Sequence, residues 1–282
     1  MKKLTKAAVK RVVHAMVCLM QKSRPGRFVY AQILDAGLAM TRDVEHRGAR
    51  LRFAVPNALN EFRAATFSSK EPETLEWIDG FDRGSVLWDI GANVGLYSCY
   101  AAVSKDCRVF AFEPSVFNLE LLARNIFLNG LAAKVTLVPL PLTERLAVSK
   151  LNMTSTDWGG AMSTFGQEYG HDGKVMNKIF EFSTIGLSMA DAADLLMVPR
   201  PDYIKMDVDG IEHLILKGGV EILRGAKSVL IEINDRFKAQ ADGAERYLRE
   251  AGFALKEKKH SEFLETDAFR DTFNQIWTRE QR

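Results

Sequence analysis

The stretch VLWDIGANVG, residues Val86–Gly95, decides the fold of this chain. Its first three residues are apolar and end at Asp89, and Gly91 and Gly95 then lead into the helix-compatible sequence LYSCYAAV. A buried parallel strand, a tight turn and a helix N-terminus have this pattern. A glycine turn lets a ligand approach the backbone because no Cβ intervenes, and helix N–H groups lie beside it. The stretch therefore predicts the nucleotide-cofactor site of an α/β domain.

Strand-like and helix-like segments alternate along the chain after residue 83. The expected strands are Val86–Asp89, Arg108–Glu113, Lys134–Pro139, Tyr203–Asp207, Val229–Ile233, Gly252–Lys256 and Phe273–Thr278. This alternation favours a mostly parallel sheet with helices on both faces. The last two strands form a hairpin-like pair, which predicts an antiparallel edge.

Two regions depart from the alternation. Residues 1–83 predict an N-terminal, mostly helical appendage, and residues 84–282 predict the cofactor-binding domain. Within that domain, a polar and glycine-rich segment at about residues 143–189 predicts an insertion at the ligand-binding edge.

The N-terminus is basic and then apolar. Five bases, from Lys2 to Arg11, begin the chain, and the last of them is followed by the run VVHAMVCLM. This resembles a secretion signal, but His14 interrupts the run and no small-residue cleavage site follows. The run is also shorter than the roughly 18 residues that a spanning helix needs. We expect a basic amphipathic helix that covers the main domain, with peripheral attachment to an anionic membrane as the alternative.

The composition is that of an ordinary globular protein, with 47% hydrophobic and 26% charged residues. A formal net charge of +2 gives no reason to favour nucleic acid as a partner. The three cysteines are odd in number and have no metal-like spacing, and Cys99 is expected to be a core thiol. A reducing compartment is therefore expected, which means the cytoplasm or the inner face of a membrane.

Acidic residues end four of the expected strands, at Asp89, Glu113, Asp207 and Glu232. Ligands of open α/β sheets bind at these carboxyl ends. The spacing from Gly91 to Glu113 is close to the roughly 20 residues between a glycine turn and a ribose-binding acid. The third glycine of the dinucleotide fingerprint is absent, and Asp89 would repel a pyrophosphate. A phosphate-free cofactor with an ammonium group, S-adenosylmethionine, therefore fits better than NAD.

Four segments in chain order, DIGANVGLYS, FEPSVFNLELLARNIFLNG, YIKMDVDGIEHLILKGG and LIEI, resemble the FkbM-type S-adenosylmethionine-dependent methyltransferases. The resemblance covers roughly residues 87–234. It implies a Rossmann-like class I methyltransferase fold, with a seven-stranded, mostly parallel sheet whose last strand is antiparallel, and O-methylation of a hydroxyl group. The family's acid in the pattern D-V-E-G is here the shorter Asp209.

The resemblance also implies a cofactor site, residue by residue. Glu113 would hold the ribose, and the segment Leu140–Thr143 would cover one face of the adenine, with Thr143 at its end. The residues implied at the methionine end and beside the adenine are Asp89, Gly91, Asn93 and Gly95, and then Pro114 and Ser115.

The candidate catalytic residues lie on or just after the strand that ends at Asp207. Methyl transfer requires an aligned acceptor hydroxyl and the removal of its proton. Asp207 is the better placed base, Lys205 shares its face of the strand, and His213 has a suitable pKa. Glu212 and His213 are alternatively surface residues at the start of a helix.

Two further hypotheses concern the acceptor. Asp207, Glu232 and Asn234 could together hold Mg²⁺, although Glu232 is equally explained as the polar end of a strand. Aromatic residues of the expected insertion are candidates for acceptor recognition or, alternatively, anchors of their own loop. They are Trp158, Tyr169 and His171.

The sequence therefore predicts an S-adenosylmethionine-dependent O-methyltransferase acting on a sugar or another small molecule. An NAD-dependent oxidoreductase and a catalytically inactive S-adenosylmethionine-binding scaffold are the alternatives.

Overall fold

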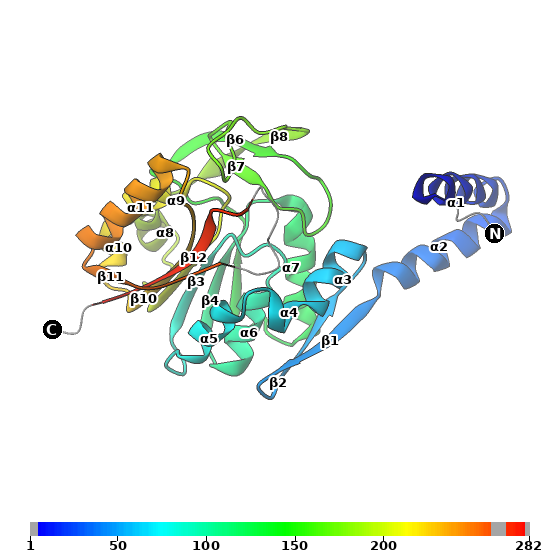
Figure 1. The fold of residues 1–282 in the computed structure, drawn as a ribbon. Helices are drawn as coiled ribbons and strands as arrows, with labels where there is room; N and C mark the ends of the chain where they lie inside the picture. The colour runs from blue at the N-terminus through cyan, green and yellow to red at the C-terminus, as the bar shows by residue number, and fades with distance from the viewer. Residues whose placement is uncertain (1–4, 261–268, 280–282) are drawn as a thin grey trace.

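A seven-stranded sheet forms the centre of the structure, a computed structural model that describes residues 5–260 and 269–279 (Figure 1). Its strands are β3 (Val86–Ile90), β4 (Arg108–Phe112), β5 (Val135–Val138), β9 (Tyr203–Met206), β10 (Ser228–Asn234), β11 (Phe253–Lys259) and β12 (Thr272–Arg279). They lie in the order β11-β12-β10-β9-β3-β4-β5, and β12 is antiparallel to both of its neighbours. The predicted sheet, with its antiparallel last strand, is confirmed. The predicted antiparallel edge is also confirmed, because β11 and β12 form an antiparallel pair at one side of the sheet.

Helices cover both faces of the sheet, as predicted. One face is covered by α5 (Pro72–Asp79), α6 (Leu96–Ser104) and α7 (Val116–Leu128), and the other by α8 (Met189–Leu195), α9 (Glu212–Lys217), α10 (Val220–Leu223) and α11 (Lys238–Glu250). Alternate strand residues point to opposite faces, so Leu87 packs in the first core and Trp88 and Ile90 in the second. Cys99 is fully buried on α6.

Residues 143–189 contain a separate three-stranded antiparallel sheet. It comprises β6 (Ala147–Met153), β7 (Ser163–Phe165) and β8 (Phe180–Gly186), in the order β7-β6-β8. Leu151 and Phe165 pack into the core beneath it. The small sheet is thus fixed to the carboxyl edge of the central sheet.

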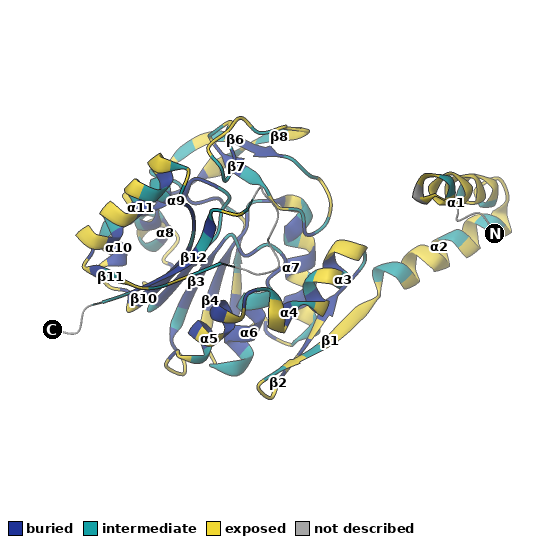
Figure 2. Cartoon of the chain, in the orientation of Figure 1, coloured by how far each residue is buried: buried dark blue, intermediate teal, exposed yellow. Residues whose placement is uncertain are grey.

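The N-terminal residues divide into two parts. The first part is a helical hairpin of α1 (Lys6–Met20) and α2 (Arg24–Leu38), which projects away from the body (Figure 1). No residue of α2 is buried, and both helices are largely exposed (Figure 2). The prediction that the N-terminal helix covers the main domain is therefore wrong. Lys2 and Lys3 lie outside the described residues.

The second part packs against the main domain, as the N-terminal helix was expected to do. It comprises β1 (Thr41–His46), β2 (Ala49–Ala54), α3 (Ala58–Ala65) and α4 (Phe67–Lys70). Phe53 and Phe67 are buried in the same core as α5 and α6.

The hairpin of β1 and β2 is joined to α7 through side chains. The Ala54 N–H donates to Asn125 Oδ1 at 2.8 Å. The Arg52 N–H donates to Asn129 Oδ1, and Asn129 Nδ2 donates to the Arg52 carbonyl, each at 2.8 Å. The free edge of β2 is thereby hydrogen-bonded to two asparagine amides.

Candidate active site

The glycine turn after β3 is held against the ends of two neighbouring strands. The N–H groups of Gly91 and Ala92 donate to the Phe112 carbonyl at 2.9 and 3.0 Å. Gly91 has φ +84°, and a Cβ there would lie 1.9 Å from the Asp207 carbonyl oxygen. Only glycine fits this position. Gly95, the N-cap residue of α6, has no side chain to cap the first-turn amides of that helix.

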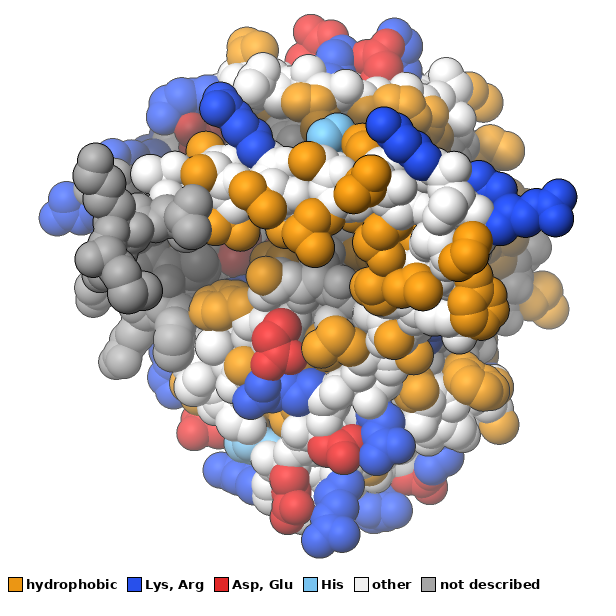
Figure 3. Space-filling model, turned by 90° about the vertical axis from the view of Figure 1, so that its right-hand side faces the viewer, with side chains coloured by type: hydrophobic (Ala, Val, Ile, Leu, Met, Phe, Trp, Pro, Cys, Tyr) orange, Lys and Arg blue, Asp and Glu red, His pale blue; other side chains and the backbone are white. Residues whose placement is uncertain are grey.

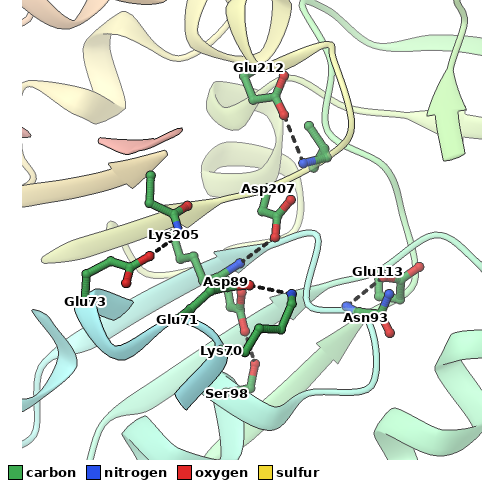
Figure 4. Close-up of polar contacts among 12 residues, drawn as sticks. Lys70, Glu71, Glu73, Asp89, Asn93, Ser98, Glu113, Lys205, Asp207 and Glu212 are labelled. Atoms are coloured by element: carbon green, nitrogen blue, oxygen red, sulfur yellow. Dashed lines mark hydrogen bonds and ion pairs between the residues drawn. The ribbon is translucent and has the colours of Figure 1, made fainter. Parts of the chain in front are cut away.

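Glu113 lies buried directly beneath this turn. Its carboxylate accepts a hydrogen bond from the Asn93 N–H at 2.8 Å (Figure 4). It accepts a second one from the Ser115 N–H, also at 2.8 Å. Burial raises the pKa of Glu113 to about 7, although these hydrogen bonds work in the opposite direction. The Asn93 and Asn118 side chains both donate to the Gly160 carbonyl, which brings the insertion over Glu113.

Polar atoms around the turn fit the predicted cofactor. Asp89 Oδ1, Asn93 Oδ1 and Ser115 Oγ are buried and have no hydrogen-bond partner among the described residues. Buried polar groups are normally hydrogen-bonded, so three such atoms beside one turn indicate a missing partner. The ammonium and hydroxyl groups of S-adenosylmethionine are suitable donors, and the residues present therefore fit this group.

A small apolar cavity of about 30 Å³ lies on the other side of the turn. Pro114, Leu140 and Val208 contribute to its lining, at the place where the sequence predicts the adenine. Thr143 is not among the lining residues, and its N–H donates to the Leu187 carbonyl at 2.7 Å. Thr143 therefore holds the base of the insertion.

A second cavity beside the turn, which we call the active-site cavity or simply the cavity, has a volume of about 270 Å³ and two distinct walls. We call residues 91–94 with Lys205, Asp207, Asp209 and Glu232 the sheet wall, because they lie at the carboxyl ends of the central strands. The outer wall is formed by α3, α4 and the insertion. Its residues are Leu59, Phe62, Arg63, Phe67, Lys70, Glu71, Ala161 and Met162.

Lys205 is the buried cation of the sheet wall. Its Nζ lies 3.3 Å from Asp207 Oδ2, and strand register places it beside Asp89 (Figure 4). Burial acts to lower the pKa of Lys205, but the carboxylates of Asp207 and Asp89 raise it well above its usual value. The structure thus brings the predicted Lys205 and Asp207 together at the cavity.

Glu71 faces this group from the outer wall. Lys70 donates to Glu71 at 2.6 Å, and the Tyr97 hydroxyl is also hydrogen-bonded to it. Burial acts to raise the pKa of Glu71, but the ammonium groups of Lys70 and Lys205 lower it to about 2. The two walls are therefore coupled through buried charge.

The turn after β9 is held by two acids. Asp209 has φ +61°, and its carboxylate accepts hydrogen bonds from the N–H groups of Met162 and Ser163. Glu212 is also buried and accepts hydrogen bonds from the Val208 and Gly210 N–H groups. Burial raises the pKa of Asp209 to about 6 and that of Glu212 to about 7. Both acids shape the loop, and only Asp209 lines the cavity.

His213 lies away from the cavity. Its ring packs against Phe237 at a centroid distance of 5.8 Å, and its Cβ closely approaches Gly243 of α11. Burial lowers its pKa. The predicted role of His213 as general base has no geometric support, because α9 directs the side chain toward α11.

The predicted metal ligands do not converge. The Asn234 amide is hydrogen-bonded to Arg236 and Thr272, and Asp207 is paired with Lys205. Among the described residues, no three His, Cys, Asp or Glu side chains are grouped as metal ligands. Glu232 instead lines the cavity, where burial and then the neighbouring carboxylates raise its pKa well above the usual range.

The aromatic residues of the insertion anchor it. The Trp158 carbonyl accepts hydrogen bonds from the Asn60 side chain, and the Tyr169 ring packs edge-on against Phe237. The His171 ring stacks on Phe269 at 4.7 Å, and Phe269 in turn lines the cavity. None of the three candidates lines the cavity itself.

Several cavity residues were not predicted from the sequence. They include Phe62, Lys70, Glu71 and Tyr97. The one available signal was the charged pair Lys70-Glu71 immediately before Pro72, in a segment that is otherwise part of a buried core.

Comparisons with known proteins relate this chain to methyltransferases. Residues 89–255 match the methyltransferase FkbM domain family. The hexuronic acid methyltransferase AglP of Haloferax volcanii is 25% identical over 190 residues, which span 67% of this chain and 73% of that protein.

Solved structures to which this chain is similar include two methyltransferases. The precorrin-6y C5,15-methyltransferase of Geobacter metallireducens has a TM-score of 0.43 and 17% identity, over 81% of this chain and 94% of that chain. An S-adenosylmethionine-dependent methyltransferase of Agrobacterium tumefaciens has a TM-score of 0.48 and 12% identity, over 86% and 71%.

The fold and the site, taken with the matched family, define a methyltransferase rather than the alternative NAD-dependent oxidoreductase. Because the match covers more than half of the chain, this protein belongs to the FkbM methyltransferase family.

Proposed function

We propose that this protein transfers the methyl group of S-adenosylmethionine to a hydroxyl group of a saccharide. The observation that carries the proposal is the cavity in which the glycine turn meets Lys205 and Asp207. The matched family supports methyl transfer, and the relative named for hexuronic acid supports a sugar acceptor.

Three parts of the chain would hold the cofactor. The Asp89 carboxylate would accept its ammonium group, and Glu113 would accept the ribose hydroxyls with its remaining lone pairs. Pro114 and Leu140 would enclose the adenine. When bound, S-adenosylmethionine supplies a methyl group on a positively charged sulfur.

The sheet wall would prepare the acceptor. Asp207 would accept a hydrogen bond from the acceptor hydroxyl and take its proton during transfer. Lys205 would keep the Asp207 carboxylate in one orientation through their 3.3 Å contact. Phe62 and Phe67 of the outer wall would exclude water from the reacting groups.

Calorimetry with S-adenosylmethionine and with NAD tests the cofactor assignment. We expect binding of S-adenosylmethionine alone, and an affinity at least about tenfold weaker in Glu113→Gln because a charged hydrogen-bond acceptor is lost. Glu120→Gln, on the exposed side of α7, is the matched control. Binding of NAD in its place, or undiminished affinity in Glu113→Gln, would contradict the assignment.

A panel of oligosaccharides that end in uronic acids or in neutral sugars tests the acceptor. Mass spectrometry should detect one added methyl group, and NMR should place it on an oxygen. Cofactor binding without transfer to any member of a broad panel would instead support the inactive scaffold.

A further inference from the structure

The α1–α2 hairpin exposes apolar side chains that a water-soluble protein normally buries. Met16, Leu19 and Phe28 are 58%, 68% and 66% exposed. Further exposed apolar residues of the two helices are Val9, Val12, Val13, Val29, Ile33 and Leu34. Figure 3 looks at the side of the molecule from which the hairpin projects, and it shows a band of hydrophobic side chains with Lys and Arg at its margins. Contiguous apolar surface of this kind marks an interaction site.

The residues of α1 are arranged for binding on one side. Val9, Val12, Val13 and Met16 have the spacing of a single helical stripe. Lys10 and Arg11 fall outside this stripe, and both are exposed. A helix with an apolar stripe and basic flanks is typical of binding in the plane of a membrane interface.

The charge of the chain is divided unevenly. Residues 1–40 contain eight of the 38 Lys and Arg but one of the 36 Asp and Glu, which is Asp35. Residues 41–282 therefore carry 30 bases against 35 acids. The near-neutral total conceals a basic hairpin on an acidic body, and such a hairpin is complementary to an anionic surface.

We propose that the α1–α2 hairpin binds the surface of an anionic phospholipid bilayer, with the apolar stripe of α1 in the interface and its basic residues at the headgroups. A second copy of the chain is a poorer occupant, because two basic hairpins would repel each other. The hairpin would lie on the bilayer and not cross it. Each helix has 15 residues, about 22 Å at 1.5 Å per residue, against a hydrocarbon core of about 30 Å. Nor does any helix in the described part of the chain have the length and apolar character to span a membrane.

Binding at the hairpin would also orient the cavity. The α2 helix leads through β1 and β2 into α3, whose Phe62 and Arg63 line the outer wall. The acceptor site would thus be held at a defined place relative to the membrane surface.

Vesicle co-sedimentation of the full chain tests the proposal. Vesicles of phosphatidylcholine alone are compared with vesicles that contain one-third phosphatidylglycerol, at low and at high salt. We expect binding to the anionic vesicles at low salt and at least about tenfold weaker partitioning in the other conditions.

Two variants should remove this binding, each with a matched control. Val12→Asp with Met16→Asp disrupts the stripe, and its control is Val175→Asp, an equally drastic change at an 86% exposed position of the insertion. The charge reversals Lys10→Glu with Arg11→Glu are compared with the exposed pair Lys238→Glu with Lys256→Glu. The stripe and charge variants should each bind at least about tenfold more weakly, and their controls should bind as the unmodified chain does.

Thermal unfolding and methyl transfer to a soluble acceptor should be unchanged in the two hairpin variants, because the hairpin buries little surface against the body. Both properties should also be unchanged in the two control variants, whose substitutions are at exposed positions. Equal sedimentation of variants and controls, or no binding to anionic vesicles, would overturn the proposal. Light scattering adds an independent outcome. A dimer that becomes a monomer in Val12→Asp with Met16→Asp would identify a second copy as the occupant and would also overturn it.

Discussion

The two walls of the cavity differ in how the chain builds them. The sheet wall comes from a few short segments at the ends of adjacent parallel strands, and its shape is set by backbone geometry at Gly91 and Asp209. The outer wall is assembled from α3, α4 and the insertion. Two of its residues, Phe62 in α3 and Met162 in the insertion, are 100 positions apart in the sequence. We therefore propose that the cofactor site and the base Asp207 depend on the sheet, whereas the rest of the acceptor pocket depends on how two attached regions pack against it.

The walls also differ in electrostatics. Burial raises the pKa values of Asp209 and Glu232 on the sheet wall, where acids lie near one another. On the outer wall, Glu71 has a lowered pKa because two ammonium groups outweigh its burial. Removing an acid with a raised pKa and removing one with a lowered pKa should consequently change the free energy of unfolding with opposite pH dependence.

Replacing the sheet-wall acid by Asp207→Asn should have the largest effect. We expect kcat to fall by about 10²–10⁴, because a general base of this kind contributes that much. The dissociation constant for S-adenosylmethionine should change little in calorimetry, with Asp242→Asn on the exposed side of α11 as control. A parallel loss of cofactor affinity would show that Asp207 serves cofactor binding and is not the base.

Glu71→Gln on the outer wall should lower the free energy of unfolding by about 3 kcal/mol at pH 7. The pKa of Glu71 is about 2 in the folded protein and about 4.5 unfolded, so its contribution is present above pH 4.5 and is lost as pH falls toward 2. Denaturant titrations at several pH values should show the deficit shrinking in that window. Glu76→Gln, exposed on α5, is the control, and a deficit independent of pH would refute the ionic explanation.

Glu212→Gln, in the turn after β9 and outside the cavity lining, should change the free energy of unfolding with the opposite pH dependence. A folded pKa of about 7 against about 4.5 unfolded gives a stabilisation that is present below pH 4.5 and is lost as pH rises through 7. In the unmodified, cofactor-free protein, Glu212 should make the free energy of unfolding decrease by up to about 1.4 kcal/mol for each pH unit between pH 5 and 7. This contribution to the slope should be absent in the variant. Glu245→Gln on α11 should leave the slope unchanged. Identical slopes in all three proteins would show that Glu212 does not titrate there.

Phe62→Ala should have the smallest effect and should be confined to the acceptor. Because Phe62 is 48% exposed, its truncation should remove only about 1 kcal/mol of apolar contact with the acceptor. The acceptor KM should therefore rise several-fold. Cofactor affinity and stability should not change. Phe127→Ala, 79% exposed on α7, is the control, and a weakened cofactor affinity in Phe62→Ala would erase the division between the walls.

The difference in how the two walls are built also explains which site residues could be predicted from the sequence. Asp89, Glu113 and Asp207 were predictable as neighbours because parallel strands end at one edge of a sheet. Glu71 and Tyr97 meet only after α4 and α6 pack, and local patterns do not contain that contact. The position of α1 was wrongly predicted. An amphipathic pattern indicates that one helix face will be buried, but it does not identify the surface against which that face packs. The side-chain direction of His213 was not predictable for a related reason, because the orientation of α9 depends on its packing against α11.

The asparagine amides on β2 have a consequence beyond the site. An edge strand with free N–H and C=O groups is a template on which other chains add strands and aggregate. Asn125 and Asn129 occupy three such groups at Arg52 and Ala54, so a helix completes the ladder that another chain would otherwise extend. Through these two amides, the end of α7 protects the β2 edge against pairing with another chain.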